Sequence, residues 1–341
     1  MIDQRYSRQV LFNGIGKSGQ EELASSRVVL VGAGALGASH AEMLARAGVG
    51  NLKIVDRDYV ELSNLQRQTL YKESDAVERL PKAIAAQRRI REINSTINVE
   101  AVVADINRSN IESIIESNDL IIDGADNFQV RYLLNDACIK HDIPWIYGAA
   151  VSGYGATMTI LPHKTPCLRC IFDEMPEPGS TPTCDTAGVI MPIIATISAI
   201  QVSEALKLLT GNAHLLHKTL IQQDIWENER TSIRPGSPDP ECVCCGRSIF
   251  SFLDSTSDEF SAVLCGRDAV QISPMNTSSK FDLKALADRL AAFSEVKSNE
   301  YLVRFFDDDR EVTVFSDGRA VIKGVDDLSQ ARSIYAKYIG T

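Results

Sequence analysis

The chain contains 341 residues, of which 44% are apolar and 23% charged, as in an ordinary globular protein. This length suffices for one large domain and a second, smaller one. A formal net charge of −10 without a long basic run argues against nucleic acid as a partner.

The first 151 residues alternate apolar, strand-like runs with helical patterns. Predicted strands cover 27–37, 51–58, 98–105, 120–127 and 144–151, and predicted helices cover 35–49, 81–93, 109–118 and 127–142. Strands that alternate with helices imply a doubly wound, mainly parallel sheet. We therefore expect an α/β domain with a Rossmann-like sheet.

The pattern changes after residue 153. Residues 155–162 are typical of an added strand, and 220–235 alternate as one antiparallel strand would. Between them, the apolar stretch 187–202 is short for a bilayer and is followed at once by charged residues. We expect a buried or subunit-interface helix there, and no membrane as a partner.

We assign 1–249 to this α/β domain and the polar segment 250–260 to a linker. Residues 261–341 are predicted to form a small α+β domain of unknown role. Its predicted strands are 269–272, 301–306 and 311–322, with a turn at 316–318, and its predicted helices are 282–293 and 328–339.

A glycine turn follows the first predicted strand. Gly32, Gly34 and Gly37 match G-x-G-x-x-G between a strand and a helix, where glycines let phosphate approach the backbone. Asp56 ends the next strand, where a carboxylate can accept hydrogen bonds from ribose hydroxyls. The same spacing also occurs in structural turns that bind nothing, and the motif alone does not name the nucleotide.

Cations after the second strand suggest a triphosphate. Arg67 follows Asp56 by 11 residues, and Lys82 begins the next helix. Two cations near a phosphate end would stabilise a departing pyrophosphate. Asp126 ends the strand at the sheet's switch region, where a carboxylate could hold Mg²⁺. The alternative is a polar loop beside a solvated helix face.

Seven ordered motifs, covering about residues 1 to 249, together resemble the MoeB/ThiF family. They are RYSRQ (5–9), GAGALG (32–37), SNLQRQ (63–68), PK (81–82), GADN (124–127), two Cys-x-x-Cys pairs and CDTAGV (184–189). Members of this family adenylate the C-terminal glycine of ubiquitin-like sulfur carriers used in molybdopterin or thiamine synthesis.

The resemblance implies ATP and Mg²⁺ as ligands, a carrier ending in Gly-Gly of the ThiS or MoaD type, and a homodimer. It implies that Asp56 binds ribose, that phosphates are bound by Asn64, Arg67 and Lys82, and that Arg8 reaches ATP from the partner subunit. The expected ATP-binding set is Gly32, Gly34, Ala35, Gly37, Asp56, Ser63, Asn64, Arg67, Lys82, Asp126 and Asn127, and the expected catalytic set is Asp126, Arg67, Arg8 and Cys184.

The cysteines divide into a metal-binding set and single residues. The N-terminus lacks a signal-peptide core, so we expect a cytoplasmic protein with reduced thiols. Two Cys-x-x-Cys pairs predict a structural, tetrahedral zinc site, with Cys245 favoured over Cys244 as the fourth ligand. The predicted ligands are Cys167, Cys170, Cys242 and Cys245.

Cys184 stands alone before the apolar helix, and in the thiamine branch a cysteine here can link covalently to the carrier. Cys138 and Cys265 are predicted to be packing residues, and the histidines show no ligand spacing. The C-terminal region resembles tails of thiamine-branch members, which favours a ThiS-type carrier. No sulfurtransferase loop is evident, so sulfur would come from a separate donor.

Two other functions fit part of the pattern. An NAD-dependent oxidoreductase explains the glycine turn and Asp56 but leaves Arg67, Lys82 and the zinc site unexplained. A non-catalytic scaffold that binds a β-grasp partner would not need the complete nucleotide-binding set.

Overall fold

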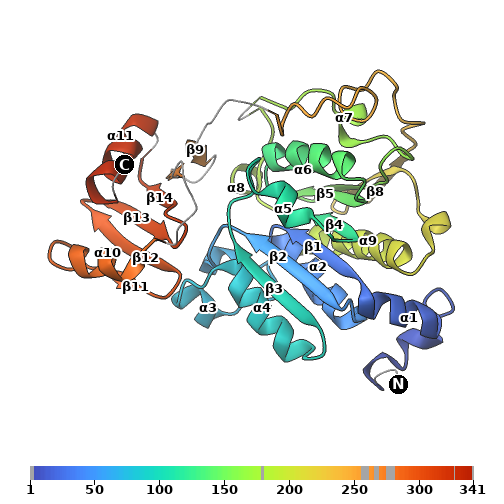
Figure 1. Cartoon of the computed structure of the whole chain (residues 1–341), viewed down its shortest axis with the longest axis horizontal. Coiled ribbons are helices and arrows are strands. Elements are labelled where there is room, and N and C mark those ends of the chain that lie inside the picture. The colour runs from blue at the N-terminus through green and yellow to red at the C-terminus, as the bar shows by residue number, and fades with distance from the viewer. Residues whose placement is uncertain are drawn as a thin grey trace. The chain divides into compact units, whose positions relative to one another are not determined.

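The computed structural model describes residues 4–177, 180–254, 261–264, 269–273, 281–325 and 327–339, and of 261–264 the backbone alone. The chain divides into two compact units, one of residues 1–177 and 187–255 and one of 178–186 and 256–341. Each unit has its own sheet and its own apolar core (Figure 1).

The first unit is built on an eight-stranded sheet of order β3-β2-β1-β4-β5-β6-β7-β8. Its strands are β1 (Arg27–Val31), β2 (Asn51–Asp56), β3 (Asn98–Val103), β4 (Leu120–Asp123), β5 (Trp145–Val151), β6 (Tyr154–Ile160), β7 (Leu220–Asp224) and β8 (Glu229–Ile233). The first five strands pair in parallel and the last three extend the sheet antiparallel. The predicted α/β fold with an antiparallel extension is confirmed.

Helices cover both faces of this sheet, which is why β1 after its first residue, residues 28–31, is an unbroken apolar run. The longer helices are α1 (Gly16–Ser25), α2 (Ala35–Ala47), α4 (Lys82–Ile93), α6 (Phe128–Lys140) and α9 (Met191–Leu209). The shorter helices are α3 (Glu73–Val77), α5 (Ile111–Ile115) and α7 (Leu168–Ile171). Single 3-10 turns are η1 (Gln4–Tyr6), η2 (Gln9–Leu11), η3 (Leu62–Asn64) and η4 (Ala213–Leu215). Helix α2 packs against α4 and α9, whereas α6 packs against α5 and α7. Figure 1 shows α5 and α6 on the sheet face opposite α2.

The register of the parallel strands places the ends of three strands together. Val31, the last residue of β1, pairs with Val55 of β2 and with Asp123 of β4. The turns that follow these strands therefore lie at one edge of the sheet.

Two elements differ from the sequence prediction. Residues 220–235 form a hairpin of β7 and β8 rather than one strand, because Asp224 Oδ1 accepts the backbone N–H groups of Trp226 and Glu227 and closes a turn. Residues 250–254, predicted to begin a linker, pack on the first core: Phe252 donates its backbone N–H to Asp136 Oδ2 at 2.8 Å.

Helix α9 contains residues 191–202 of the apolar stretch, begins later than the stretch does, and continues to Leu209. By length and composition it could cross a membrane, with a mean hydropathy of 1.3, but 44% of its apolar window is buried inside the protein. It packs on α2, β5 and β6, and its buried face includes Gln201 and Glu204. This packing is that of a core helix.

The second unit is built on an antiparallel sheet of order β11-β12-β13-β14-β10-β9, accompanied by helices. Its elements are β9 (Ser261–Leu264), β10 (Ala269–Ile272), α10 (Leu283–Leu290), β11 (Lys297–Ser298), β12 (Leu302–Asp307), β13 (Arg310–Phe315), β14 (Ala320–Lys323) and α11 (Leu328–Tyr338). The predicted turn at 316–318 separates β13 from β14, with Gly318 at φ +81°. Cys265 lies outside the described residues. Helix α8 (Cys184–Ala187) begins in this unit.

Candidate active site and metal centre

A pocket that is open to solvent lies where β1, β2, β3 and β4 end. Its lining comprises Val31, Gly32, Gly34, Val55, Asp56, Arg57, Asp58, Lys82, Ala104, Asp105, Ile106, Gly124, Ala125, Asp126, Asn127 and Val130. This is the crevice in which open α/β sheets bind ligands.

The glycine turn is shaped by close backbone approaches. Gly32 has φ +92°, and a Cβ there would lie 2.4 Å from the carbonyl oxygen of Gly124. A Cβ on Gly37 would lie 1.9 Å from the carbonyl oxygen of Gly32, so both positions require glycine. At Gly34, by contrast, a Cβ would meet nothing within 4 Å. Gly34 therefore leaves the backbone at the start of α2 open for a ligand.

The Tyr71 hydroxyl, which sequence reasoning missed, supports this turn. It lies 2.6 Å from the carbonyl oxygen of Ala33 and 3.3 Å from that of Lys82, and can donate its proton to either. Tyr71 thus links the segment 62–71 to the glycine turn and to the start of α4.

Asp56 is held with its carboxylate at the pocket wall. Its Oδ2 accepts the N–H of Ala33 at 2.6 Å, and its Oδ1 accepts the N–H of Asp58 at 2.7 Å. Burial raises the pKa of the Asp56 carboxyl, and Lys82 opposes this effect. Each oxygen keeps a further lone pair with which it could accept a ribose hydroxyl.

Lys82 reaches the same pocket from the first residue of α4. Its side chain is only 6% exposed, and its Nζ lies 3.1 Å from Asp58 Oδ2. The ammonium group is therefore fixed beside the Asp58 carboxylate rather than extended into solvent.

The turn 124–127 is held by a buried ion pair. Arg131 Nε lies 3.1 Å from Asp123 Oδ2, and the same guanidinium donates to the carbonyl oxygen of Ala125 at 2.7 Å. Asp123 Oδ1 accepts the N–H of Ala125 at 2.9 Å. These contacts place Asp126 at the pocket.

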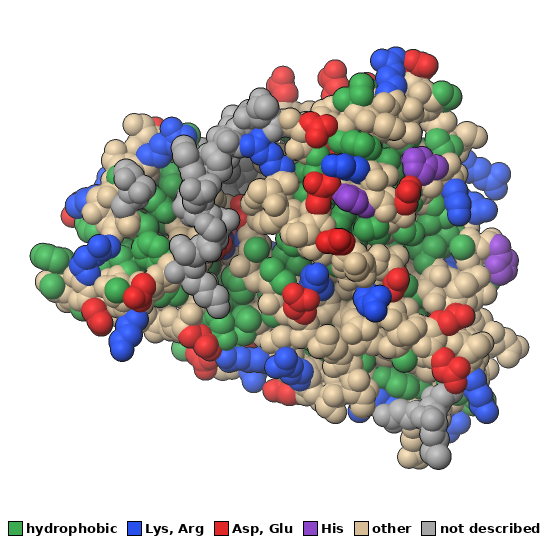
Figure 2. Space-filling view, viewed as in Figure 1, with side chains coloured by type: hydrophobic (Ala, Val, Ile, Leu, Met, Phe, Trp, Pro, Cys, Tyr) green, Lys and Arg blue, Asp and Glu red, His purple; other side chains and the backbone are tan. Residues whose placement is uncertain are grey.

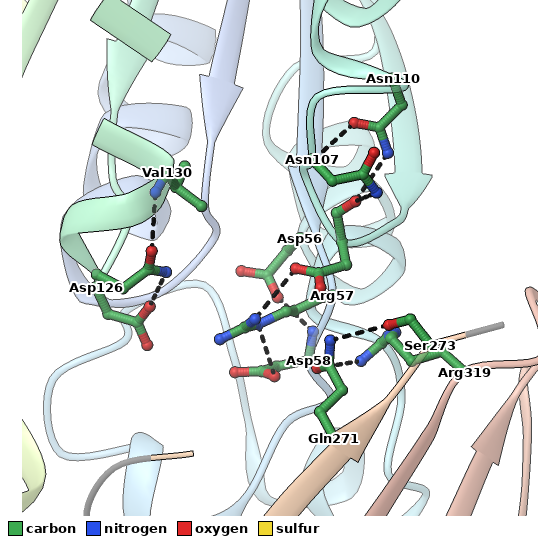
Figure 3. A network of polar contacts seen from close by, with 12 residues as sticks. Asp56, Arg57, Asp58, Asn107, Asn110, Asp126, Val130, Gln271, Ser273 and Arg319 are labelled. Carbon is green, nitrogen blue, oxygen red and sulfur yellow. Dashed lines mark hydrogen bonds and ion pairs between the residues drawn. The ribbon is translucent and has the colours of Figure 1, made fainter. Parts of the chain in front are cut away.

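Asn127 has a structural contact in addition to its place in the pocket. Its Oδ1 caps α6 by accepting the N–H of Val130, and its Nδ2 donates to Asp126 Oδ1 at 3.2 Å (Figure 3). Arg131 and Asp123 were not predicted. The signals in the sequence were Asp123 near the end of a predicted strand and an arginine within the predicted helix that follows.

The structure brings together six of the eleven residues of the expected nucleotide set. Gly32, Gly34, Asp56, Lys82, Asp126 and Asn127 line the pocket. Ala35, Gly37, Ser63, Asn64 and Arg67 are not among its lining residues, and neither is Arg8, which is exposed beside η2. Cys184 begins α8 in the second unit.

The segment after η3 has bonds of its own. Asn64 is buried, and its Oδ1 accepts the N–H of Glu61 at 3.0 Å. Arg67 donates from NH1 to the carbonyl oxygen of Ser63 at 2.9 Å. A guanidinium carries five N–H donors, so the bond to Ser63 leaves donors with which Arg67 could contact a phosphate.

The surface in Figure 2 carries both signs of charge. On the face shown, Lys and Arg side chains of the described residues are interspersed with Asp and Glu. That face therefore presents no continuous basic stripe of the kind that follows a nucleic-acid backbone.

Four cysteines form a compact group in the first unit. The sulfurs of Cys167, Cys170, Cys242 and Cys245 all lie within 4.8 Å of one another. Zn–S bonds of about 2.3 Å place the sulfurs of a tetrahedral site roughly 3.8 Å apart. The distances are 3.9 Å from Cys167 to Cys170, 3.6 Å from Cys167 to Cys242 and 3.4 Å from Cys170 to Cys245. The donor set and its size both fit zinc.

Cys244 lies outside this group. It is fully buried, and its sulfur accepts from Asn135 Nδ2 at 3.2 Å, while Asn135 Oδ1 accepts the N–H of Leu168 beside Cys167. Cys138 is also fully buried, and burial raises the pKa of its thiol, as suits a packing residue.

Comparison with known proteins identifies the first unit. The model of the ThiF family matches residues 6–244. A sulfur carrier protein ThiS adenylyltransferase of Bacillus subtilis is 49% identical over 338 residues, which cover 98% of this chain and 99% of the relative. A SAMP-activating enzyme E1 of Haloferax volcanii is 41% identical over 242 residues, covering 71% of this chain and 88% of the relative.

Solved structures share the fold. A crystal structure of E. coli MccB with ATP superimposes with a TM-score of 0.63 at 23% identity, covering 72% of this chain and 75% of that one. Another, of MccB with MccA-N7isoASN, gives 0.64 at 23% identity over 72% and 76%. At this identity the likeness concerns the fold alone.

Proposed function

The chain belongs to the ThiF family, and we propose that it uses ATP to adenylate the C-terminal glycine of a ubiquitin-like sulfur carrier. The products are a carrier acyl-adenylate and pyrophosphate. The carrier would end in Gly-Gly, and we favour a ThiS-type carrier of thiamine biosynthesis over a MoaD-type one. The support for this choice is the Bacillus relative, whose similarity spans both units.

The observation that carries the proposal is the grouping of four kinds of contact at one sheet edge. Gly34 leaves an open backbone cradle, Asp56 presents a carboxylate, and Lys82 and Asp126 face the same pocket. A polyphosphate at the start of α2 and a ribose at Asp56 match these contacts. The oxidoreductase alternative has no comparable support.

In the reaction, a carboxylate oxygen of the carrier attacks the α-phosphorus of ATP. The bond between this phosphorus and the oxygen that bridges the α- and β-phosphates then breaks, and pyrophosphate leaves. Lys82 would stabilise the charge that develops on the leaving pyrophosphate. We propose that Arg67 joins it through its remaining N–H groups, with Asn64 and Ser63 beside the phosphates. Positioning and charge stabilisation then supply most of the rate.

The charge of the pocket calls for a divalent cation. Its lining carries four carboxylates, Asp56, Asp58, Asp105 and Asp126, against two cations, Arg57 and Lys82. A triphosphate would be repelled unless a cation entered with it. We propose that Asp126 holds Mg²⁺, which when bound would neutralise phosphate charge.

The remaining parts of the proposal concern the metal, the partners and the place of action. Zinc bound by the four clustered cysteines would be structural, because a closed set of four thiolates leaves no open position. We propose a cytoplasmic homodimer in which Arg8 contacts the nucleotide of the partner subunit. A separate protein would supply sulfur, and Cys184 would be a candidate for a covalent link to the carrier.

Carrier-dependent ATP–pyrophosphate exchange tests the proposal. Purified protein, Mg²⁺ and either a ThiS-type or a MoaD-type carrier are incubated with labelled pyrophosphate. Exchange should require a carrier and be lost in Asp126→Asn. The matched control is Asp142→Asn, because Asp142 follows α6 whereas Asp126 precedes it, and Asp142 is exposed. Absence of exchange with both carriers would refute the proposal.

A further inference from the structure

One cation of the pocket has no role in the scheme above. Arg57 follows Asp56 directly and lines the pocket, and its NH1 lies 3.1 Å from Asp105 Oδ1. Its Nε lies 4.0 Å from Asp58 Oδ1. The Arg57 and Asp105 side chains are each 23% exposed, so the pair is anchored but still reaches the surface of the pocket.

The order of the strands fixes which part of a nucleotide lies beside this pair. The glycine turn follows β1, Asp56 ends β2, and Asp105 follows β3, which is the next strand outward. Asp56 pairs with Val103, so Arg57 and Asp105 leave the sheet as neighbours. With phosphates at the glycine turn and ribose at Asp56, the base extends toward Arg57 and Asp105.

The surroundings of Arg57 suit a flat aromatic group. Ala104, Ile106 and Val130 contribute apolar surface to the same pocket. Figure 3 shows the Arg57 guanidinium extending into the space between the strand end at Asp56 and the turn at Asp126. A guanidinium plane held by a carboxylate can stack on an aromatic face, an arrangement that lysine cannot reproduce.

We propose that Arg57, held by Asp105, is the base-stacking wall of the nucleotide pocket and gives the protein affinity for ATP beyond that for its phosphates. The inference rests on the proposed function, because it takes the ligand to be a nucleotide bound through its phosphates at the glycine turn. Asp105 is the positioning residue, and Arg57 is the residue that contacts the base.

Binding of two ligands separates a base contact from a phosphate contact. Dissociation constants for Mg–ATP and for Mg–tripolyphosphate, which has no base, are measured by calorimetry without any carrier. Arg57→Leu should weaken ATP binding roughly tenfold, the value of a cation–π contact partly shielded from water, and leave tripolyphosphate binding within about twofold. Arg57→Lys should resemble Arg57→Leu, and Asp105→Asn should cause a smaller loss confined to ATP.

The matched control is Arg89→Gln, which removes an ion pair of similar length outside the pocket, 2.9 Å to Glu92. It should leave both constants unchanged. Equal weakening of ATP and tripolyphosphate by Arg57→Leu, or full ATP affinity in Arg57→Lys, would overturn the stacking role. If the wild-type protein binds neither ligand, the proposed function is overturned as well. If the wild type binds ATP and the Arg57 variants bind it with the same dissociation constant, this inference alone is overturned.

Discussion

Gly34 is the residue at which a single methyl group should separate folding from nucleotide binding. A Cβ at this position meets nothing within 4 Å, and φ is −71°, outside the left-handed region that favours glycine, with ψ at −149°. Gly34→Ala should therefore still fold, with a free energy of unfolding changed by about 1 kcal/mol or less.

The same methyl projects into the pocket where the phosphates are expected. An extra methyl group in a tightly packed contact costs about 1–3 kcal/mol, so the dissociation constant for Mg–ATP should rise roughly 5- to 150-fold. Calorimetric titration with ATP and urea unfolding of the same preparation measure the two effects separately.

Gly37→Ala is the contrasting variant. Its Cβ would lie 1.9 Å from the carbonyl oxygen of Gly32, so the turn must shift and the free energy of unfolding should fall by about 1–3 kcal/mol or more. Wild-type ATP affinity in Gly34→Ala would refute the assignment of this turn to phosphate binding. Wild-type stability in Gly37→Ala would refute the steric reasoning.

Three further predictions concern stability. Tyr71→Phe removes the donor 2.6 Å from the carbonyl oxygen of Ala33, so urea unfolding should show a loss of about 1–3 kcal/mol. Cys245→Ser should release zinc, as measured by metal analysis, and lower the melting temperature, whereas Cys244→Ser should retain the metal. Burial lowers the pKa of His40 to about 4, so below pH 6.5 the unfolded chain binds a proton that folded His40 does not. Stability should therefore fall as the pH drops through this window, by about 2 kcal/mol between pH 7 and pH 5, and less in His40→Gln.

Each of these predictions can fail clearly. Unchanged stability of Tyr71→Phe would mean that the glycine turn does not depend on that hydroxyl. If Cys244→Ser loses zinc and Cys245→Ser retains it, Cys244 rather than Cys245 is the fourth zinc ligand. An identical pH dependence of unfolding in His40→Gln and wild type would show that other groups account for it.

The alternating pattern of the first 151 residues predicted the parallel sheet well, because strands covered on both faces read as short, continuous apolar runs. Asp56 and Asp126 were also found from sequence, since residues that end parallel strands meet at one edge. The Asp123–Arg131 pair was not predicted, because a contact that joins a strand end to a helix leaves no periodic signal.

The end of α9 shows the same limit. Ser203, Glu204 and Lys207 suggested that the apolar element stops near 202, yet the helix runs to Leu209. Glu204 is buried, with Lys207 Nζ 2.6 Å from one carboxylate oxygen and the N–H of His217 3.1 Å from the other. The sequence alone does not distinguish a charged residue that is buried and ion-paired from one that is exposed to solvent.

The measurement that tests the central claim most directly is the intact mass of the carrier after incubation with ATP, Mg²⁺ and this protein. We predict that a ThiS-type carrier ending in Gly-Gly gains one adenylyl group, the mass of AMP less one water, and that the adduct is absent with Asp126→Asn or with a carrier lacking its last glycine. If carriers of both types stay unmodified while the protein binds ATP, the proposed adenylation is contradicted.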